Sequence, residues 1–429
     1  MKNNKQKVLL MSLTILPFLS SPVIAETLEQ VVQETLSSNP RVLASENEKL
    51  AREEQLKQAS AGNYPSIDLT AGVGKETSKN AGTSQTDVKL DRKETAITLR
   101  QNLFSGFETS SQVDQQQARV KAAEHMLASE RDEVTLRTSQ VYFDVIRKRE
   151  ILSLAQKNLN KHQTIFNKVQ QRAKSGVGRK SDRDQARGRL ALARSNLSAS
   201  KANLFAAEAN YMRIVGKAVP AQMEKPQSVA QTLPANIEEA LTTARQSNPQ
   251  LASADSEVVA AIAMKDGSQS GHYPKLDLVA SKAWNEDLDG VVGKDEETYV
   301  MLQLRWNIFN GGSDSASNSE KAHLYGKAKN SRDDAMRLVD QTVRLSWGEY
   351  VMRKSQLADL NIHYQSSLKS RNTYDNQFRI GKRSLLDLLD TENEVFQSGR
   401  AHINAKYDLI QSQHKVLASL GKLSETLAK

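Results

Sequence analysis

The second half of this chain repeats the first. The sequence Ser-Asn-Pro at 38–40 recurs at 247–249, and Tyr-Pro at 64–65 recurs at 273–274, an offset of 209 residues (274 − 65 = 209). Further along, Asn-Leu-Phe-Ser-Gly at 102–106 matches Asn-Ile-Phe-Asn-Gly at 307–311, an offset of 205 (311 − 106 = 205). A four-residue length difference therefore falls between Asp68 and Asn102, where a loop would tolerate it. A repeat of this length indicates one large supersecondary unit used twice, and not a short solenoid unit.

The N-terminus has the pattern of a secretory signal peptide. Lys2, Lys5 and Lys7 precede an apolar run from Val8 to Phe18, and the small residues that end at Ala25 offer a cleavage site. A retained membrane anchor is the alternative, but about ten apolar residues fall short of the roughly 20 that a spanning helix needs. The sequence contains no cysteine, which excludes disulfides, thiolate metal sites and a lipid on an N-terminal cysteine.

The composition favours long helices with narrow buried seams. Hydrophobic residues make up 38% and aromatic residues 5% of the 429 residues, which is a weak core for one globule of this size. Apolar residues recur every seven positions, at 113, 120, 127, 134 and 141, and after a four-residue shift at 145, 152, 159, 166 and 173. This spacing predicts a coiled-coil seam with one stutter. The net charge of +9 is spread along the chain, so a solvated mixed-charge surface is favoured over a site for anionic substrates.

The same order of elements is predicted in both repeats. In repeat 1, a helix capped by Asn39 runs to about 61, and two alternating strands follow at about 65–75 and 94–104, joined by a polar loop at 75–92. A helical hairpin at about 107–215 then turns at Gly176 and Gly178. Repeat 2 has strands at about 274–284 and 298–309, a loop at 285–297, and a hairpin at about 312–420 that turns at Gly381. The predicted division is a signal peptide (1–25), repeat 1 (26–216), a linker (217–234), repeat 2 (235–423) and a C-terminal tail (424–429).

The paired strands have the length and alternation of outer-membrane barrel strands. Each has roughly ten residues with one apolar and one polar face, although a soluble hairpin packed on the helices would show the same pattern. Four strands cannot close, because the smallest single-chain barrels use about eight. Three copies of the chain would supply twelve strands in a ring with cyclic symmetry.

This ordered set, present twice over residues 26–423, resembles the TolC family of outer-membrane ducts. The resemblance implies a mainly α fold with a β-barrel contribution: a homotrimer that shares a twelve-stranded barrel in the outer membrane. Below the barrel, a long α-helical tube would extend into the periplasm and close toward its inner end.

The resemblance also implies a gate at the second hairpin tip. By position, Asp387 and Asp390 would line the pore entrance, while Arg383 and Phe378 would form a latch with Asp182 near the other tip. The family aromatic is usually tyrosine, and Phe378 has no hydroxyl to donate, so a latch here would depend mainly on Arg383. Independently of the family, Asp387 and Asp390 are three residues apart on one helical face, and threefold symmetry would make two cation-selective rings of them. Solvated surface aspartates are the alternative.

Catalytic and cofactor sites are not predicted. The seven histidines have no metal-ligand spacing, and no Gly-x-Ser-x-Gly elbow is present. Residues 176–181 contain glycines and a lysine but lack the spacing of a phosphate-binding loop, so a hairpin turn is favoured. Asp182 and Asp184 interrupt the basic residues near this turn, which argues against nucleic-acid binding.

The sequence therefore predicts a passive outer-membrane exit duct of a tripartite export system, and not an enzyme. Its expected partners are a periplasmic adaptor (membrane fusion) protein, an inner-membrane ABC or proton-driven transporter, and outer-membrane lipid. Type I protein secretion is favoured, because no lipid-anchor cysteine is present and the chain resembles the secretion-type branch. Small-molecule efflux is the alternative within this class. A coiled-coil scaffold or adaptor without a barrel is the alternative from another class.

Overall fold

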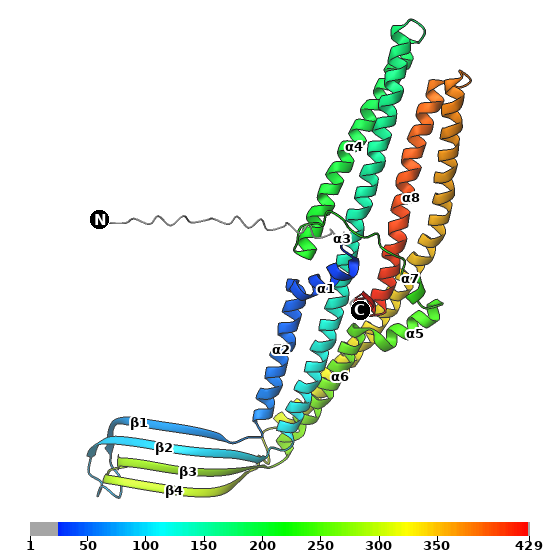
Figure 1. The fold of residues 1–429 in the computed structure, drawn as a ribbon. Helices are drawn as coiled ribbons and strands as arrows, with labels where there is room; N and C mark the ends of the chain where they lie inside the picture. Colours follow the sequence, from blue (N-terminus) through cyan, green and yellow to red (C-terminus); the bar gives the residue numbers. More distant parts are fainter. Residues whose placement is uncertain (1–24, 428–429) are drawn as a thin grey trace, which may run out of the picture.

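The molecule is elongated, with a sheet at one end and two helical hairpins at the other (Figure 1). The computed structural model describes residues 25–427, so the predicted signal peptide, except its last residue, and the final two residues lie outside the described part. Long helices connect the sheet to the hairpin tips. The last described helix, α9 (Leu423–Leu427), lies near the middle of the length, beside α1 (Leu28–Ser38) (Figure 1).

Six elements recur in the same order in the two repeats, and repeat 2 ends with one additional short helix. Repeat 1 consists of α1 (Leu28–Ser38), α2 (Pro40–Ala61), β1 (Ser66–Ser78), β2 (Val88–Phe104), α3 (Glu108–Lys174) and α4 (Lys180–Val215). Repeat 2 consists of α5 (Ile237–Ser247), α6 (Pro249–Gly267), β3 (Lys275–Leu288), β4 (Val291–Arg305), α7 (Ser313–Arg379), α8 (Leu385–Ser419) and α9 (Leu423–Leu427). Two 3₁₀ helices, η1 (Ala230–Thr232) and η2 (Ser268–His272), lie in the connections. Among the described residues, no helix is both long enough and apolar enough to cross a lipid bilayer.

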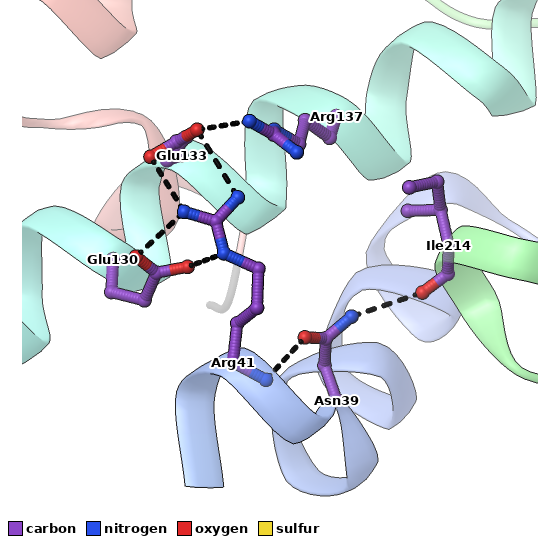
Figure 2. Close-up of polar contacts among 6 residues, drawn as sticks. All are labelled: Asn39, Arg41, Glu130, Glu133, Arg137 and Ile214. Atoms are coloured by element: carbon purple, nitrogen blue, oxygen red, sulfur yellow. Dashed lines mark hydrogen bonds and ion pairs between the residues drawn. The ribbon is translucent and has the colours of Figure 1, made fainter. Parts of the chain in front are cut away.

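The repeated Asn-Pro pair joins the start of each repeat to its end. The side-chain oxygen of Asn39 accepts a hydrogen bond from the backbone N–H of Arg41, which caps α2, while its amide nitrogen donates to the carbonyl of Ile214 at 3.0 Å (Figure 2). Asn248 repeats both contacts: it caps α6 and donates to the carbonyl of Ser419 at 3.0 Å. The asparagine amide suits this position, because its oxygen accepts the capping bond while its nitrogen donates to the carbonyl.

Arg41 adds an ion-pair network to this joint. Its guanidinium contacts Glu130 at 2.8 Å and Glu133 at 3.2 Å, both on α3, and Glu133 also pairs with Arg137 (Figure 2). These contacts fix the start of α2 against the middle of α3.

The sheet has the order β1-β2-β3-β4 with every neighbouring pair antiparallel. The register aligns Ile67, Leu99, Ala280 and Val300 in one row across the four strands, so one face of the sheet is aliphatic. The opposite face is polar and includes a hydrogen bond between the hydroxyls of Thr98 and Ser281 at 3.2 Å. The outer edges of β1 and β4 have no strand partner within the described residues.

The strands are longer than the sequence pattern indicated. Half of the polar segment 75–92 is strand, since β1 ends at Ser78 and β2 begins at Val88. The segment 285–297 reduces to a turn at Asp289-Gly290. The other strand ends differ slightly from the expected bounds; β4, for example, ends at Arg305 and not near 309. The reason is that alternation continues with lysines and acids after the aliphatic residues stop, so the hydrophobic pattern ends before the backbone pairing does.

The C-terminal segment also differs from expectation. Residues Leu423–Leu427 were expected to fall largely in a tail, yet they form α9. Leu423 and Leu427 are buried in the central core, together with Val31, Tyr142 and Tyr211. This core lies where α1, α3, α4, α8 and α9 meet, half-way along the molecule.

The seam along α3 follows a different heptad phase from the one in the sequence prediction. Of the ten predicted positions only Val134 and Val145 are buried, and the others are half-buried. Toward the hairpin tip the buried residues recur with alternating spacings of four and three: Ile151, Ala155, Asn158, His162, Ile165 and Val169. Asn158 and His162 concealed this phase, because polar residues at core positions do not register in a hydrophobic pattern.

Candidate gate at the hairpin tips

Both hairpin tips are built on a glycine in the left-handed conformation. Gly176 has φ +77° and follows α3, and Gly381 has φ +77° and follows α7. At the second tip, the N–H of Gly381 donates to the carbonyl of Phe378 and the N–H of Lys382 to that of Gln377, which satisfies the last carbonyls of α7. Gly178 has no positive φ but lies against α3, where an added Cβ would stand 3.0 Å from the backbone nitrogen of Ala173.

The two tips are held together by a small apolar cluster. Ile165 and Val169 from α3 and Ala186 from α4 pack with Leu385, Leu388 and Leu389 from α8. Phe378 is half-buried against this cluster, and the Arg172 guanidinium of the other hairpin lies 5.5 Å from the centre of its ring. Phe378 therefore anchors α7 to the first hairpin through packing and a cation–π contact, which needs no hydroxyl.

Arg383 is bound within its own hairpin. Its Nε donates to the side-chain oxygen of Gln377 at 2.9 Å, its guanidinium carbon lies 4.2 Å from the centre of the Tyr374 ring, and an Nη lies 3.6 Å from Asp387. Tyr374 was not singled out from the sequence. The available signal was its spacing, because it lies one helical turn before Phe378 and so shares its face.

Asp387 caps α8. It forms a capping box with Ser384: the hydroxyl of Ser384 accepts from the N–H of Asp387 at 3.1 Å, and the Asp387 carboxylate accepts from the N–H of Ser384. Hydrogen bonding with Ser384 and the charge of Arg383 hold the pKa of Asp387 below its usual value. The residue therefore remains ionised at neutral pH and carries a fixed negative charge at the tip.

Asp390 joins the two hairpins. Its carboxylate forms an ion pair with the guanidinium of Arg189 on α4. Because 55% of the Asp390 side chain is exposed, the pair is open to solvent on one side. The two aspartates of the predicted rings thus have different surroundings: Asp387 is bound to its own hairpin, and Asp390 is bound across to the other.

Asp182 lies in the first turn of α4, where a negative charge suits the positive end of the helix dipole. None of the described residues forms a hydrogen bond or an ion pair with it. In one protomer, Arg383 and Asp182 are therefore on neighbouring tips without a direct contact. A latch between them stays a prediction.

Glu392 is a buried acid near the hairpin tips that the sequence analysis did not identify. Glu392, one and a half turns along α8 from Asp387, is 5% exposed and lies 3.5 Å from Arg371 of α7. Burial raises the pKa of Glu392, and the charge of Arg371 opposes this shift only in part. No spacing rule marks a single acid on a helix as buried, so only the packing reveals it.

These contacts connect the tips of the two hairpins. Apolar packing and the Arg189–Asp390 pair hold the two hairpins together, and Arg383 stiffens the turn between α7 and α8. Within residues 25–427, no group of three acidic or histidine side chains is placed to hold a metal ion.

The comparisons with known proteins agree with this architecture. The family model described as outer membrane efflux protein matches twice, at residues 31–217 and 240–422, which reproduces the two repeats. The chain is 21% identical to the outer membrane protein TolC of Vibrio cholerae, over 95% of this chain and 93% of that protein. It is 22% identical to the proteases secretion protein PrtF of Dickeya chrysanthemi, over 91% of this chain and 87% of that one.

A solved structure shares the fold. The outer-membrane channel OprN superposes with a TM-score of 0.80 at 18% identity, over 92% of this chain and 89% of that one. The likeness extends over sheet, helices and hairpins together, so the mainly α fold with a β contribution is confirmed. The chain belongs to the outer membrane efflux protein family, the TolC family predicted from its repeats, and is a channel of the outer membrane and not an enzyme.

Proposed function

We propose that this chain is the outer-membrane exit duct of a tripartite export system for proteins, and that it works as a homotrimer. In this arrangement three sheets close a twelve-stranded barrel and six hairpins form a tube into the periplasm. A periplasmic adaptor and an inner-membrane ABC or proton-driven transporter supply substrate and energy. The scaffold alternative is dropped, because the chain belongs to a family of outer-membrane channels.

The observation that supports a trimer best is the open sheet. β1 and β4 lie at opposite edges of the sheet, and neither outer edge has a partner among the described strands. Unpaired backbone groups cannot face lipid, because each costs several kcal/mol without water. Pairing β4 of one copy with β1 of the next satisfies both edges, and twelve strands is an even number within the range of closed outer-membrane barrels.

Helices α7 and α4 each carry a stripe of exposed apolar side chains. On α7, Leu338, Leu345 and Met352 recur every seven residues and are 49%, 66% and 67% exposed. On the side formed by α4 and α2, Phe205 (74% exposed) and Met212 repeat the same spacing. In the upper half of Figure 1, α4 and α7 form opposite sides of the molecule. Two different apolar stripes on opposite sides suit head-to-tail contacts that close into a ring.

A pair of substitutions tests this assembly. Leu345→Asp should abolish the trimer in detergent, because each ring would bury three unpaired carboxylates. Lys354→Asp, on the same helix but at an exposed charged position, should leave the trimer intact. Mass determination by multi-angle light scattering reads out both variants. A wild-type chain that remains a monodisperse monomer in detergent would overturn the proposed function.

Protein cargo is the finer part of the proposal. Two observations support it: the chain has no cysteine to carry a lipid anchor, and its similarity to a proteases secretion protein extends over 91% of its length. The family description names efflux, so export of small molecules is the competing function. Deleting the gene should remove specific proteins from the culture medium. Hypersensitivity to drugs with an unchanged secreted proteome would replace protein secretion with efflux.

A further inference from the structure

The aliphatic face of the sheet changes character at its far end. Near the helices, the face carries Leu278 with Leu302, then Ile67 with Leu99, and then Leu69 with Ile97. Charged residues on the same side of the same strands begin with Lys282, in the row of Leu69 and Ile97, and become frequent beyond Trp284. The register places five lysines on this face: Lys75, Lys89, Lys93, Lys282 and Lys294.

The charges of the far end are sorted by face. The aliphatic face carries these five lysines and three acids, Asp91, Glu286 and Glu296. The opposite face carries Arg92 and four acids over the same rows: Glu76, Glu94, Asp295 and Glu297. Strand alternation puts neighbouring residues on opposite faces, so this sorting gives a basic outer face and an acidic inner face.

Most of these lysines are free to bind something else. Lys93 is paired with Glu286 at 3.3 Å, whereas Lys75, Lys89 and Lys294 are exposed and form no ion pair or hydrogen bond with any described residue. Lys282 lies over the ring of Trp284, 5.1 Å from its centre. A lysine beside a tryptophan at the end of an aliphatic band is typical of the boundary between hydrocarbon and headgroups.

The dimensions agree with that boundary. From Leu276 to Trp284 the strand advances eight residues, or about 27 Å along its axis at roughly 3.4 Å per residue. A tilt of about 40° reduces this to about 20 Å, close to the band of about 25 Å that outer-membrane barrels present to lipid. The free lysines therefore begin where the hydrocarbon ends.

We propose that Lys75, Lys89 and Lys294, with Lys282 at the boundary, form a binding surface for the phosphate groups of outer-leaflet lipid headgroups. This inference depends on the proposed duct, because only insertion in that orientation brings the face to the headgroups. A lysine ammonium is a compact donor that suits a phosphate oxygen, and each lysine near an anionic surface adds to the attraction. The acids Asp91, Glu286 and Glu296 on the same face repel phosphate, so binding is restricted to the positions between them.

The test uses the trimeric mature protein in detergent and lipid A as the probe. Lipid A with two phosphates is compared with the same lipid after enzymatic removal of both. The wild-type trimer should bind the phosphorylated form at least about tenfold more tightly, as read by native mass spectrometry. The variant Lys75→Gln/Lys89→Gln/Lys294→Gln should lose that preference. Inorganic phosphate at the same concentration should not displace the lipid.

A matched control has the same change of charge elsewhere. Lys121, Lys201 and Lys354 are exposed on the helices and also lack partners among the described residues, so their replacement by Gln should leave the preference unchanged. Equal binding of both lipids by the wild-type trimer would overturn the lysine surface and leave the duct standing. Equal losses in the test and control variants would likewise overturn it. A wild-type chain that never forms trimers would instead count against the duct itself.

Discussion

At the scale of single residues, the candidate gate is a set of charged side chains whose partners differ in position. Arg383 is held by Tyr374, Gln377 and Asp387 of its own hairpin, while Asp390 is held by Arg189 of the other. The resemblance to the TolC family indicated these gate positions, and the i, i+3 spacing of Asp387 and Asp390 supported them independently. The sequence could not predict the partners, because Arg189 and Asp390 are 201 residues apart and meet only after the hairpins pack.

Replacing Arg383 should loosen the closed tip. In planar bilayers, we expect Arg383→Ala to raise conductance with little change in ion selectivity, because a clamp shifts the open population without setting the potential in the pore. Arg379→Ala is the matched control, since the only partner of Arg379 among residues 25–427 is Asp375, one turn away on its own helix. Wild-type conductance in the Arg383 variant would show that the predicted latch does not operate.

Replacing Arg189 and replacing the two aspartates should change cation selectivity in opposite directions, which tests the predicted acid rings. If Asp387 and Asp390 line the pore, their joint replacement by alanine should lower cation selectivity, because six negative charges leave the trimer. Arg189→Gln should raise cation selectivity, because it frees the Asp390 carboxylate from its neutralising partner. Reversal potentials in asymmetric KCl measure both. Unchanged values in both variants would place the aspartates on the outer surface, where salt screens charges within about 8 Å.

Glu392 should make stability depend on pH. Its pKa is raised in the folded protein above the ordinary 4.5, so the folded state holds the proton more tightly than the unfolded state. Stability is therefore greatest below pH 4.5 for this group and falls as pH rises through the raised pKa. Glu392→Gln removes that fall and can still accept from Arg371. The melting temperature of the variant should exceed that of the wild type by more at pH 8 than at pH 5, and a constant difference would contradict this.

At the scale of elements, helices were easier to predict than strands. The expected hairpins at about 107–215 and 312–420 agree within one residue at each end with the helix pairs α3–α4 and α7–α8, because the glycines at their ends and turns are explicit in the sequence. The strands were predicted too short beside both loops. Next to the first loop, for example, residues 89–93 look like loop residues when their sequence is read in isolation. Backbone pairing with β1 keeps them extended, and pairing over long range does not appear in local composition.

Gly421 follows α8 and lies against the junction of α5 and α6, so its substitution tests how these ends pack together. It has φ +73°, and an added Cβ would stand 2.4 Å from the Pro249 ring and 2.8 Å from the Ser247 carbonyl. Gly421→Ala should therefore lower the unfolding temperature, with the left-handed conformation alone costing about 1–2 kcal/mol. Gly188→Ala, in open space within α4, should raise it slightly, because alanine favours the helix by about 0.5–1 kcal/mol. Differential scanning calorimetry on both variants checks the opposite signs.

At the scale of the whole molecule, the long axis sets a topology. The turns between paired strands lie at one end and the glycine turns of the hairpins at the other (Figure 1). In a duct that crosses the outer membrane, the first end faces the exterior and the second lies in the periplasm. The resemblance to the TolC family already implied this polarity, with a barrel in the outer membrane and a helical tube that extends into the periplasm.

Epitope tags can read this topology in intact cells. A tag inserted at Gly82, in the turn between β1 and β2, should bind antibody without permeabilisation. A tag at Gly178, in the first hairpin turn, should bind only after the outer membrane is opened. Surface labelling of the Gly178 tag in intact cells would reverse the proposed orientation.

The unpaired edges of the sheet constrain the order in which chains associate and enter the membrane. A lone protomer cannot place its aliphatic face in hydrocarbon while the edges of β1 and β4 stay unpaired, so membrane entry has to wait for chains to meet. A chain with one intact and one damaged edge strand can still pair with a neighbouring chain through the intact edge. The barrel that it joins then cannot close. In a cell that makes sound and damaged copies equally, only about one ring in eight would be free of damaged chains, so such an allele should be dominant.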